Sequence, residues 1–164
     1  MAATPAIAAL GKARITHEVH RYTHDPRSDA YGAEAVDALA TTLGVQPAQI
    51  FKTLVISVSG GARDHLAVAV LPVPQKLSLK AAAAALGASK AVMAEAKAVT
   101  RSTGYVLGGV SPIGQRTSLP TVVDASALTW PRVLCSAGRR GLEVELTPAD
   151  LVAVTGAVTA EICA

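Results

Sequence analysis

Aromatic side chains are scarce in this 164-residue chain and make up only 3% of it. Binding of single-stranded nucleic acid through stacked bases relies on such rings, so their scarcity argues against that mode of binding. Cysteines are equally few, and Cys135 and Cys163 fit neither a disulfide framework nor a Cys-x-x-Cys metal site. No apolar run reaches the roughly 18 residues of a membrane span, and residues 1–10 lack the features of a secretory signal. We therefore expect a cytoplasmic protein without a membrane partner.

Charged residues are also few. They make up 16% of the chain, against about 25% in typical domains. Apolar residues reach 51%, with alanine supplying a large share, so extended disorder is not indicated. The length suits one domain over residues 1–164. The net charge of +3 permits contact with phosphates but does not require it.

The residue patterns divide the chain into short elements that do not alternate regularly. Caps and apolar periodicity predict helices over about 5–10, 33–43, 79–86, 93–100 and 148–155, with Gly11 ending the first. Alternating or β-branched runs predict strands over about 15–24, 51–58, 66–70, 121–124, 132–136 and 142–146. This irregular order favours a mixed α/β (α+β) fold over a doubly wound parallel sheet.

Lys52 lies in the most strand-like run of the chain, from Phe51 to Val58. A lysine in an apolar strand costs free energy unless its ammonium reaches a partner or a cleft. It could reach water from the end of the strand. It could also point into a cleft beside the glycine-rich segment 101–114, where bare backbone can approach a ligand. Such a cleft would suit an anionic or ester-bearing substrate.

Other reactive residues do not form a recognised motif. In a strand, His20 and His24 share one face and His17 takes the other, and no acidic or thiol ligand follows at a known spacing, so we expect no metal site. Ser111 is a poor candidate for a serine-hydrolase elbow, because the glycine spacing is wrong and the following proline has no N–H for an oxyanion. For Cys135, a place in the core is favoured over a role as nucleophile.

Two further segments leave alternatives open. The glycine-rich segment matches neither a dinucleotide fingerprint nor a P-loop, so it is either a tight turn or a donor of backbone N–H groups to a carbonyl or phosphate. Arg139 and Arg140, between Gly138 and Gly141, form either a solvated turn or a basic rim that meets a phosphate backbone.

Six segments occur together in an order typical of one enzyme family. They are Thr4-Pro5-Ala6, His20-x-Tyr22-x-His24-Asp25-Pro26, Phe51-Lys52-Thr53-Leu54, the run from His65 to Val70, the loop from Arg101 to Gly114, and Ser136-x-Gly138-x-Arg140-Gly141-Leu142. Over nearly its whole length, the chain resembles the YbaK/EbsC family of aminoacyl-tRNA deacylases.

The resemblance implies a compact, partly barrel-like mixed sheet surrounded by helices. It also implies trans-editing, in which a free-standing enzyme hydrolyses Cys-tRNA(Pro) that prolyl-tRNA synthetase has mischarged. Cysteine and proline are close in size, and a pocket separates such side chains by only about 10²-fold. The implied partners are tRNA(Pro) mischarged with cysteine and prolyl-tRNA synthetase, without a cofactor. The alternatives are another substrate such as Ala-tRNA(Pro), or a catalytically silent tRNA-binding module.

The resemblance also assigns roles to individual residues. Lys52 holds the 3′-terminal adenosine and ester region, and the backbone of Gly108, with neighbouring Gly109, faces the scissile carbonyl. The residues implied to contact the aminoacyl group are Tyr22, Tyr31, Ser136 and Glu143. The residues implied to bind tRNA are Arg139 and Arg140. No protein nucleophile is implied, because the thiol of the substrate is proposed to attack its own ester.

Overall fold

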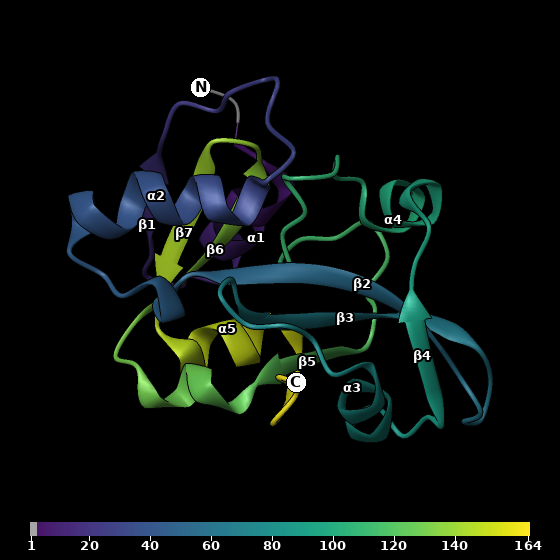
Figure 1. Cartoon of the computed structure of the whole chain (residues 1–164). Helices are drawn as coiled ribbons and strands as arrows, with labels where there is room; N and C mark the ends of the chain where they lie inside the picture. Colours follow the sequence, from purple (N-terminus) through teal and green to yellow (C-terminus); the bar gives the residue numbers. More distant parts are fainter. Residues whose placement is uncertain (1–2) are drawn as a thin grey trace.

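The computed structural model describes residues 3–164, which form helices packed around two β-sheets (Figure 1). The helices are α1 (Pro5–Lys12), α2 (Tyr31–Leu43), α3 (Leu79–Ala85), α4 (Ala96–Thr103) and α5 (Pro148–Thr155), with 3-10 turns η1 (Pro47–Gln49) and η2 (Ala125–Thr129). The strands are β1 (Glu18–Arg21), β2 (Phe51–Ser59), β3 (His65–Pro72), β4 (Lys90–Met93), β5 (Thr121–Asp124), β6 (Val133–Arg139), β7 (Leu142–Leu146) and β8 (Val158–Ala160).

The two sheets meet at the start of β2. The smaller sheet has the order β1-β7-β6 and is antiparallel throughout. The larger has the order β4-β2-β3-β5-β8, in which β4, β2 and β3 pair antiparallel and β5 and β8 join in parallel. An isolated bridge between Ile50 and Leu134 joins the sheets just before β2. The predicted mixed α/β fold is therefore confirmed.

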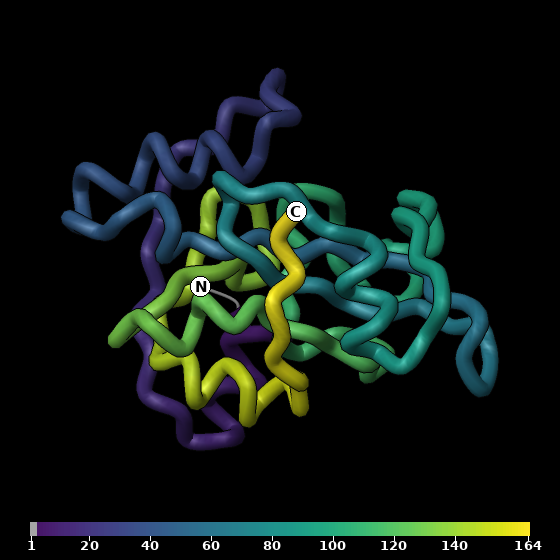
Figure 2. The backbone as a smooth tube through the Cα atoms, turned by 60° about the horizontal axis from the view of Figure 1, so that its bottom comes forward, coloured from purple at the N-terminus to yellow at the C-terminus, as the bar shows by residue number. Residues whose placement is uncertain are grey.

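Three apolar clusters hold the layers together. One contains Phe51 and Val70 from the larger sheet and Val133 and Val144 from the smaller. A second covers the other face of the larger sheet, where the alanines of α3 permit a close approach. The third is small and places Leu39 of α2 against the bridge between the sheets. Figure 2 shows α2 on the side of the molecule away from α1 and α5.

Several predicted element boundaries are confirmed by caps. Ser78 accepts a hydrogen bond from the Ala81 N–H at the start of α3, and Thr147 accepts one from Asp150 at the start of α5. Gly44 ends α2 with a φ of 67°, a left-handed conformation that glycine adopts without strain.

Other predictions of elements are wrong. Helix α1 does not end at Gly11 but runs to Lys12, because the N–H of Ala13 still bonds to the Ala9 carbonyl. Residues 90–93 form strand β4, although the predicted helix starts at residue 93, and strand β8 is not predicted at all. Both are short edge strands that form by pairing with a longer neighbour, which a local pattern does not reveal. None of the helices within residues 3–164 has the length and apolar character to cross a bilayer.

Candidate active site

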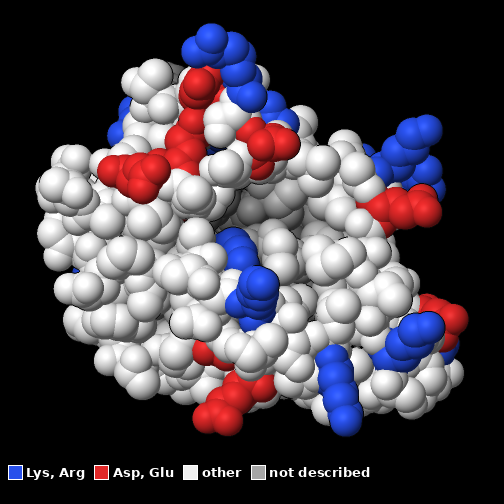
Figure 3. Space-filling view, viewed as in Figure 1, with Lys and Arg blue, Asp and Glu red and all other residues white. Residues whose placement is uncertain are grey.

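A cavity of about 610 Å³ opens where α2, β2, α4 and the glycine-rich loop meet. It is visible as the hollow in Figure 3. Of the nine site residues predicted from the sequence, six line it: Tyr22, Tyr31, Lys52, Gly108, Ser136 and Glu143. Gly109, Arg139 and Arg140 do not line it. Most of the predicted site is therefore brought together in one place.

Lys52, the second residue of β2, lies at the wall of this cavity. Its ammonium donates a hydrogen bond of 2.6 Å to the carbonyl of Gln75, in the segment after β3. Partial burial lowers the pKa of Lys52 below its usual value. An ammonium has three N–H donors, so the bond to Gln75 fixes the side chain and leaves donors for a ligand. The expectation that Lys52 and Gly108 share a cavity is met.

Gly108 makes room for an aromatic ring. Its φ is 85°, and a Cβ at this position would lie 2.6 Å from Cδ1 of Tyr31. A side chain here would be both strained and in collision with the ring. The neighbouring Gly109 faces elsewhere: a Cβ on it would lie 2.9 Å from the Cα of Arg139, and its N–H donates to the Val106 carbonyl. Of the two glycines, only Gly108 borders the cavity.

Arg140 joins two walls of the cavity without lining it. Its Nε donates to the Leu107 carbonyl at 2.7 Å, and its Nη2 donates to the Tyr31 hydroxyl at 3.1 Å. The guanidinium also lies over the Tyr31 ring. The side chain therefore ties α2 to the glycine-rich loop, a role that sequence reasoning missed because it depends on the direction of the side chain. Arg139 is exposed at the β6–β7 turn.

Glu143 is a buried carboxyl that also lines the cavity. It is 5% exposed, and no hydrogen bond or ion pair within residues 3–164 involves its side chain. Burial raises the pKa of Glu143 to about 8. Burial, and then the charge of Glu143, raise the pKa of Tyr22 to about 12. Ser136 is paired with Glu143 across the β6–β7 ladder, and its hydroxyl accepts the N–H of Gly138. The wall of the cavity thus contains both a cation, Lys52, and an acid, Glu143.

Thr53 is a cavity residue that sequence reasoning missed. Its hydroxyl is buried and has no hydrogen-bond partner in the part of the chain that the structure describes. A buried hydroxyl without a partner is costly unless a ligand or water satisfies it. Threonine is common in strands, so its presence in β2 carried no signal.

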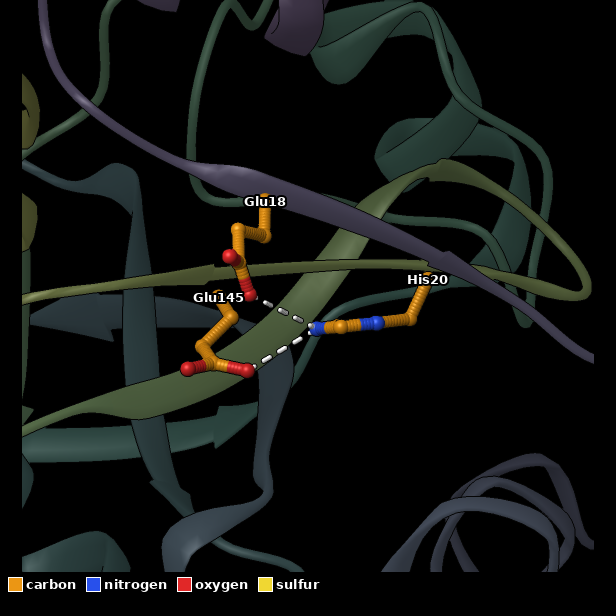
Figure 4. Close-up of side chains that lie close together, drawn as sticks. All are labelled: Glu18, His20 and Glu145. Atoms are coloured by element: carbon orange, nitrogen blue, oxygen red, sulfur yellow. Dashed lines mark hydrogen bonds and ion pairs between the residues drawn. The ribbon is translucent and has the colours of Figure 1, made fainter. Parts of the chain in front are cut away.

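The three histidines near the N-terminus do not form one site. His17 contacts the Ile15 carbonyl, and His24 contacts Glu34. His20 Nε2 lies 2.8 Å from Glu145 Oε1 and 3.9 Å from Glu18 Oε2 (Figure 4).

Strand pairing supplies the acidic neighbours of His20 that the sequence did not reveal, since Glu18 stands opposite Glu145 in the β1–β7 ladder. The other oxygen of Glu145 accepts a hydrogen bond of 2.7 Å from Arg132 Nε. Although three potential ligand atoms lie close together, the Glu145 carboxylate is already shared by two partners. We interpret this group as a network of polar contacts, in which the contact between His20 and Glu145 fastens β1 to β7.

Comparisons with known proteins agree with this geometry. The family model described as the aminoacyl-tRNA editing domain matches residues 31–154. The chain is 38% identical over 128 residues to EbsC of Enterococcus faecalis, named as a proposed Cys-tRNA(Pro)/Cys-tRNA(Cys) deacylase, covering 78% of this chain and 76% of that protein. It is 30% identical over 116 residues to YwhH of Bacillus subtilis, whose name assigns no function, covering 71% of each chain.

Solved structures share the fold over the whole chain. One described as a proposed trans-editing enzyme for prolyl-tRNA synthetase is 27% identical, with a TM-score of 0.78 over 100% of this chain and 99% of the other. A second, of a hypothetical protein, is 28% identical, with a TM-score of 0.80 over 98% and 100% of the two chains. The family predicted from the sequence is thus confirmed: this chain belongs to the aminoacyl-tRNA editing domain family.

Proposed function

We propose that this protein is a free-standing editing deacylase that hydrolyses Cys-tRNA(Pro). The observation that carries the proposal is the shared cavity of about 610 Å³, whose wall contains Lys52, Gly108 and Glu143. A cavity of this size accepts a small aminoacyl group together with part of its terminal nucleotide. Membership of the editing family and the resemblance to EbsC support the same substrate class.

Three candidates within residues 3–164, Cys135, Ser111 and Ser136, do not qualify as a protein nucleophile. Cys135 is fully buried outside the cavity, and burial raises the pKa of its thiol strongly. Ser111 is also buried outside the cavity. Ser136 lines the cavity but makes no hydrogen bond to Glu143 that would activate it.

The thiol of the substrate itself therefore serves as the nucleophile in this proposal. Its sulfur forms a bond to the ester carbonyl, the bond from that carbon to the ribose oxygen breaks, and the thiol proton passes to the ribose oxygen. Water then opens the resulting cyclic thioester to give free cysteine. The protein supplies orientation and stabilises the oxyanion.

Three residues have defined parts in this scheme. Lys52 binds the phosphate or ribose of the terminal adenosine and stays in place through its bond to Gln75. The Gly108 N–H, which has no acceptor within residues 3–164, donates to the developing oxyanion. Glu143 receives the α-ammonium of the cysteinyl group, because an incoming cation restores the charged state that burial disfavours.

The test is a deacylation assay on Cys-tRNA(Pro), Cys-tRNA(Cys), Ala-tRNA(Pro) and Ser-charged tRNA, with wild-type protein and Lys52→Ala. We expect hydrolysis of the cysteinyl substrates and a loss of most activity in Lys52→Ala. Lys80→Ala is the matched control, because Lys80 is an exposed lysine of α3 that does not line the cavity.

Each other outcome has a clear meaning. Efficient hydrolysis of Ala-tRNA(Pro) or Ser-charged tRNA would exclude thiol assistance, since these substrates carry no thiol. Wild-type activity in Lys52→Ala would remove Lys52 from the mechanism. Salt-sensitive tRNA binding without any deacylation would identify the protein as a binding module.

A further inference from the structure

The two sides of the cavity mouth carry opposite charge. Residues 22–46, which form α2 and the loop before it, contain four acidic side chains and one arginine. That arginine, Arg27, is paired with Asp25 at 3.4 Å, and Asp29 lines the cavity itself. On the other side, residues 90–116 contain four Lys or Arg and one glutamate. Figure 3 shows acidic side chains above the hollow on the α2 side, with basic ones at the top of that side, and basic side chains next to an acidic one over α4.

Helix α4 has an apolar face toward the cavity and a basic face toward the solvent. Its inner face is apolar: Val99 is buried, and both Ala96 and Val99 line the cavity. Lys97 and Arg101 are exposed and lie four residues apart, so they share the outer face. The helix therefore forms one wall of the cavity while presenting two cations to the solvent beside the mouth.

Arg116 extends this row of cations. Its backbone N–H donates to the Thr103 carbonyl, and its Nη1 donates to the Arg101 carbonyl at 3.4 Å, which places its guanidinium at the C-terminal end of α4. Its side chain packs beside Gly104, on the same helical face as Lys97 and Arg101. None of these three cations forms a salt bridge with an acidic group in the part of the chain that the structure describes.

We propose that this row, Lys97, Arg101 and Arg116, binds the phosphates of the tRNA acceptor stem. The inference rests on the proposed function, which places the 3′-terminal ester in the cavity and so brings the nearby duplex to its mouth. A polyanion at the mouth is repelled by the α2 side and attracted by the α4 side, and at physiological salt such forces act over about 8 Å. The direction of approach follows from this difference in charge.

The geometry distinguishes this surface from the β6–β7 turn. The Arg140 guanidinium already binds Leu107 and Tyr31, so it is committed to the protein. In the row on α4, only Arg116 uses its guanidinium for a contact within residues 3–164, a long hydrogen bond to the Arg101 carbonyl, and none of the three cations forms a salt bridge there. The charge of the row is therefore available to phosphates. Arg139, which is exposed at the turn, provides a direct comparison in the experiment.

The test measures binding of uncharged tRNA(Pro) at several salt concentrations. For Lys97→Ala/Arg101→Ala we expect Kd to rise roughly tenfold or more, and the slope of log K against log salt to become shallower by about 2. Arg116→Ala should reduce the slope by about 1 more. Lys12→Ala/Arg14→Ala is the matched control, since these exposed cations at the end of α1 do not line the cavity. Thermal unfolding checks that all variants fold.

A second measurement separates this inference from the proposed function. On a short cysteinylated oligonucleotide that ends in CCA and has no duplex, the α4 double variant should retain the wild-type rate, whereas its KM for Cys-tRNA(Pro) should rise. A wild-type Kd and slope in the double variant would overturn the inference, as would a loss of binding confined to Arg139→Ala. If the wild-type protein deacylates nothing, the proposed function fails, yet the binding comparison still decides where tRNA docks.

Discussion

The guanidinium carbon of Arg140 lies 4.8 Å from the centre of the Tyr31 ring. This contact joins the β6–β7 turn to the first residue of α2, whose start has no side-chain cap from Ala30. The same guanidinium holds the Leu107 carbonyl, next to the glycine that makes room for the ring. One side chain thus fixes the relative positions of α2 and the loop that borders the cavity.

Arg140→Ala should therefore impair the site, although Arg140 itself does not line the cavity. We expect kcat/KM to fall by about tenfold and the free energy of unfolding to fall by about 1 kcal/mol, through loss of the cation–π contact and two hydrogen bonds. Arg140→Lys should restore only part of this, because lysine lacks the planar fork that binds both Leu107 and Tyr31. Steady-state kinetics and urea unfolding measure both effects. Full rescue by lysine would reduce the role of Arg140 to its charge.

Gly108→Ala tests the close approach of the loop to Tyr31. The new Cβ would lie 2.6 Å from the ring at a φ of 85°, so we expect a loss of about 1–3 kcal/mol in stability and most of the activity. Gly156→Ala is the matched control: Gly156 has a φ of 65° and open space around it. The control should share the backbone strain of roughly 1 kcal/mol but keep wild-type kcat/KM. Equal activity in both variants would contradict the role of Gly108.

The sequence predicted which residues line this site better than it predicted the contacts between their side chains. For Lys52, the sequence left open a cleft or open water, because a charge in an apolar strand needs one of the two, and the structure shows the cavity. Ser136 and Glu143 came from the family resemblance, and they face each other because a short hairpin sets their register.

The remaining contacts depend on tertiary structure. His20 and Glu145 are 125 residues apart in the chain and meet only through the β1–β7 ladder. A turn at Arg139 and Arg140 was one of two alternatives that the sequence left open, and the direction of the Arg140 side chain was not predicted. Strands β4 and β8 likewise form by pairing with neighbouring strands. Because they are so short, their residues carry little local signal for a strand.

Glu143 should make stability depend on pH. Burial raises its pKa from the ordinary value of 4.5 to about 8. Between these values the folded protein keeps a proton that the unfolded chain has released, so the free energy of unfolding falls as pH rises. This stability is fully present below pH 4.5 and is lost as pH rises through about 8.

Glu143→Gln removes this titration. Urea unfolding at about pH 5, 7 and 9 should show the variant gaining stability relative to wild type, by on the order of a few kcal/mol at the highest pH. The same variant should bind the cysteinyl substrate more weakly, because glutamine gives the α-ammonium no charge. Parallel stability curves for the two proteins would mean that Glu143 titrates normally.

Cys135→Ala tests whether the protein uses a nucleophile of its own. Cys135 is fully buried and does not line the cavity, whereas Cys163 is half-buried near the end of the chain. Because burial raises the pKa of the Cys135 thiol, it is not a thiolate near neutral pH. We expect Cys135→Ala to hydrolyse Cys-tRNA(Pro) at the wild-type rate and to lose about 1 kcal/mol of stability, through the atom removed from the core. Iodoacetamide should label Cys163 first and leave activity intact. A folded Cys135→Ala protein without activity would instead place the attacking sulfur in the protein and remove the need for a thiol on the substrate.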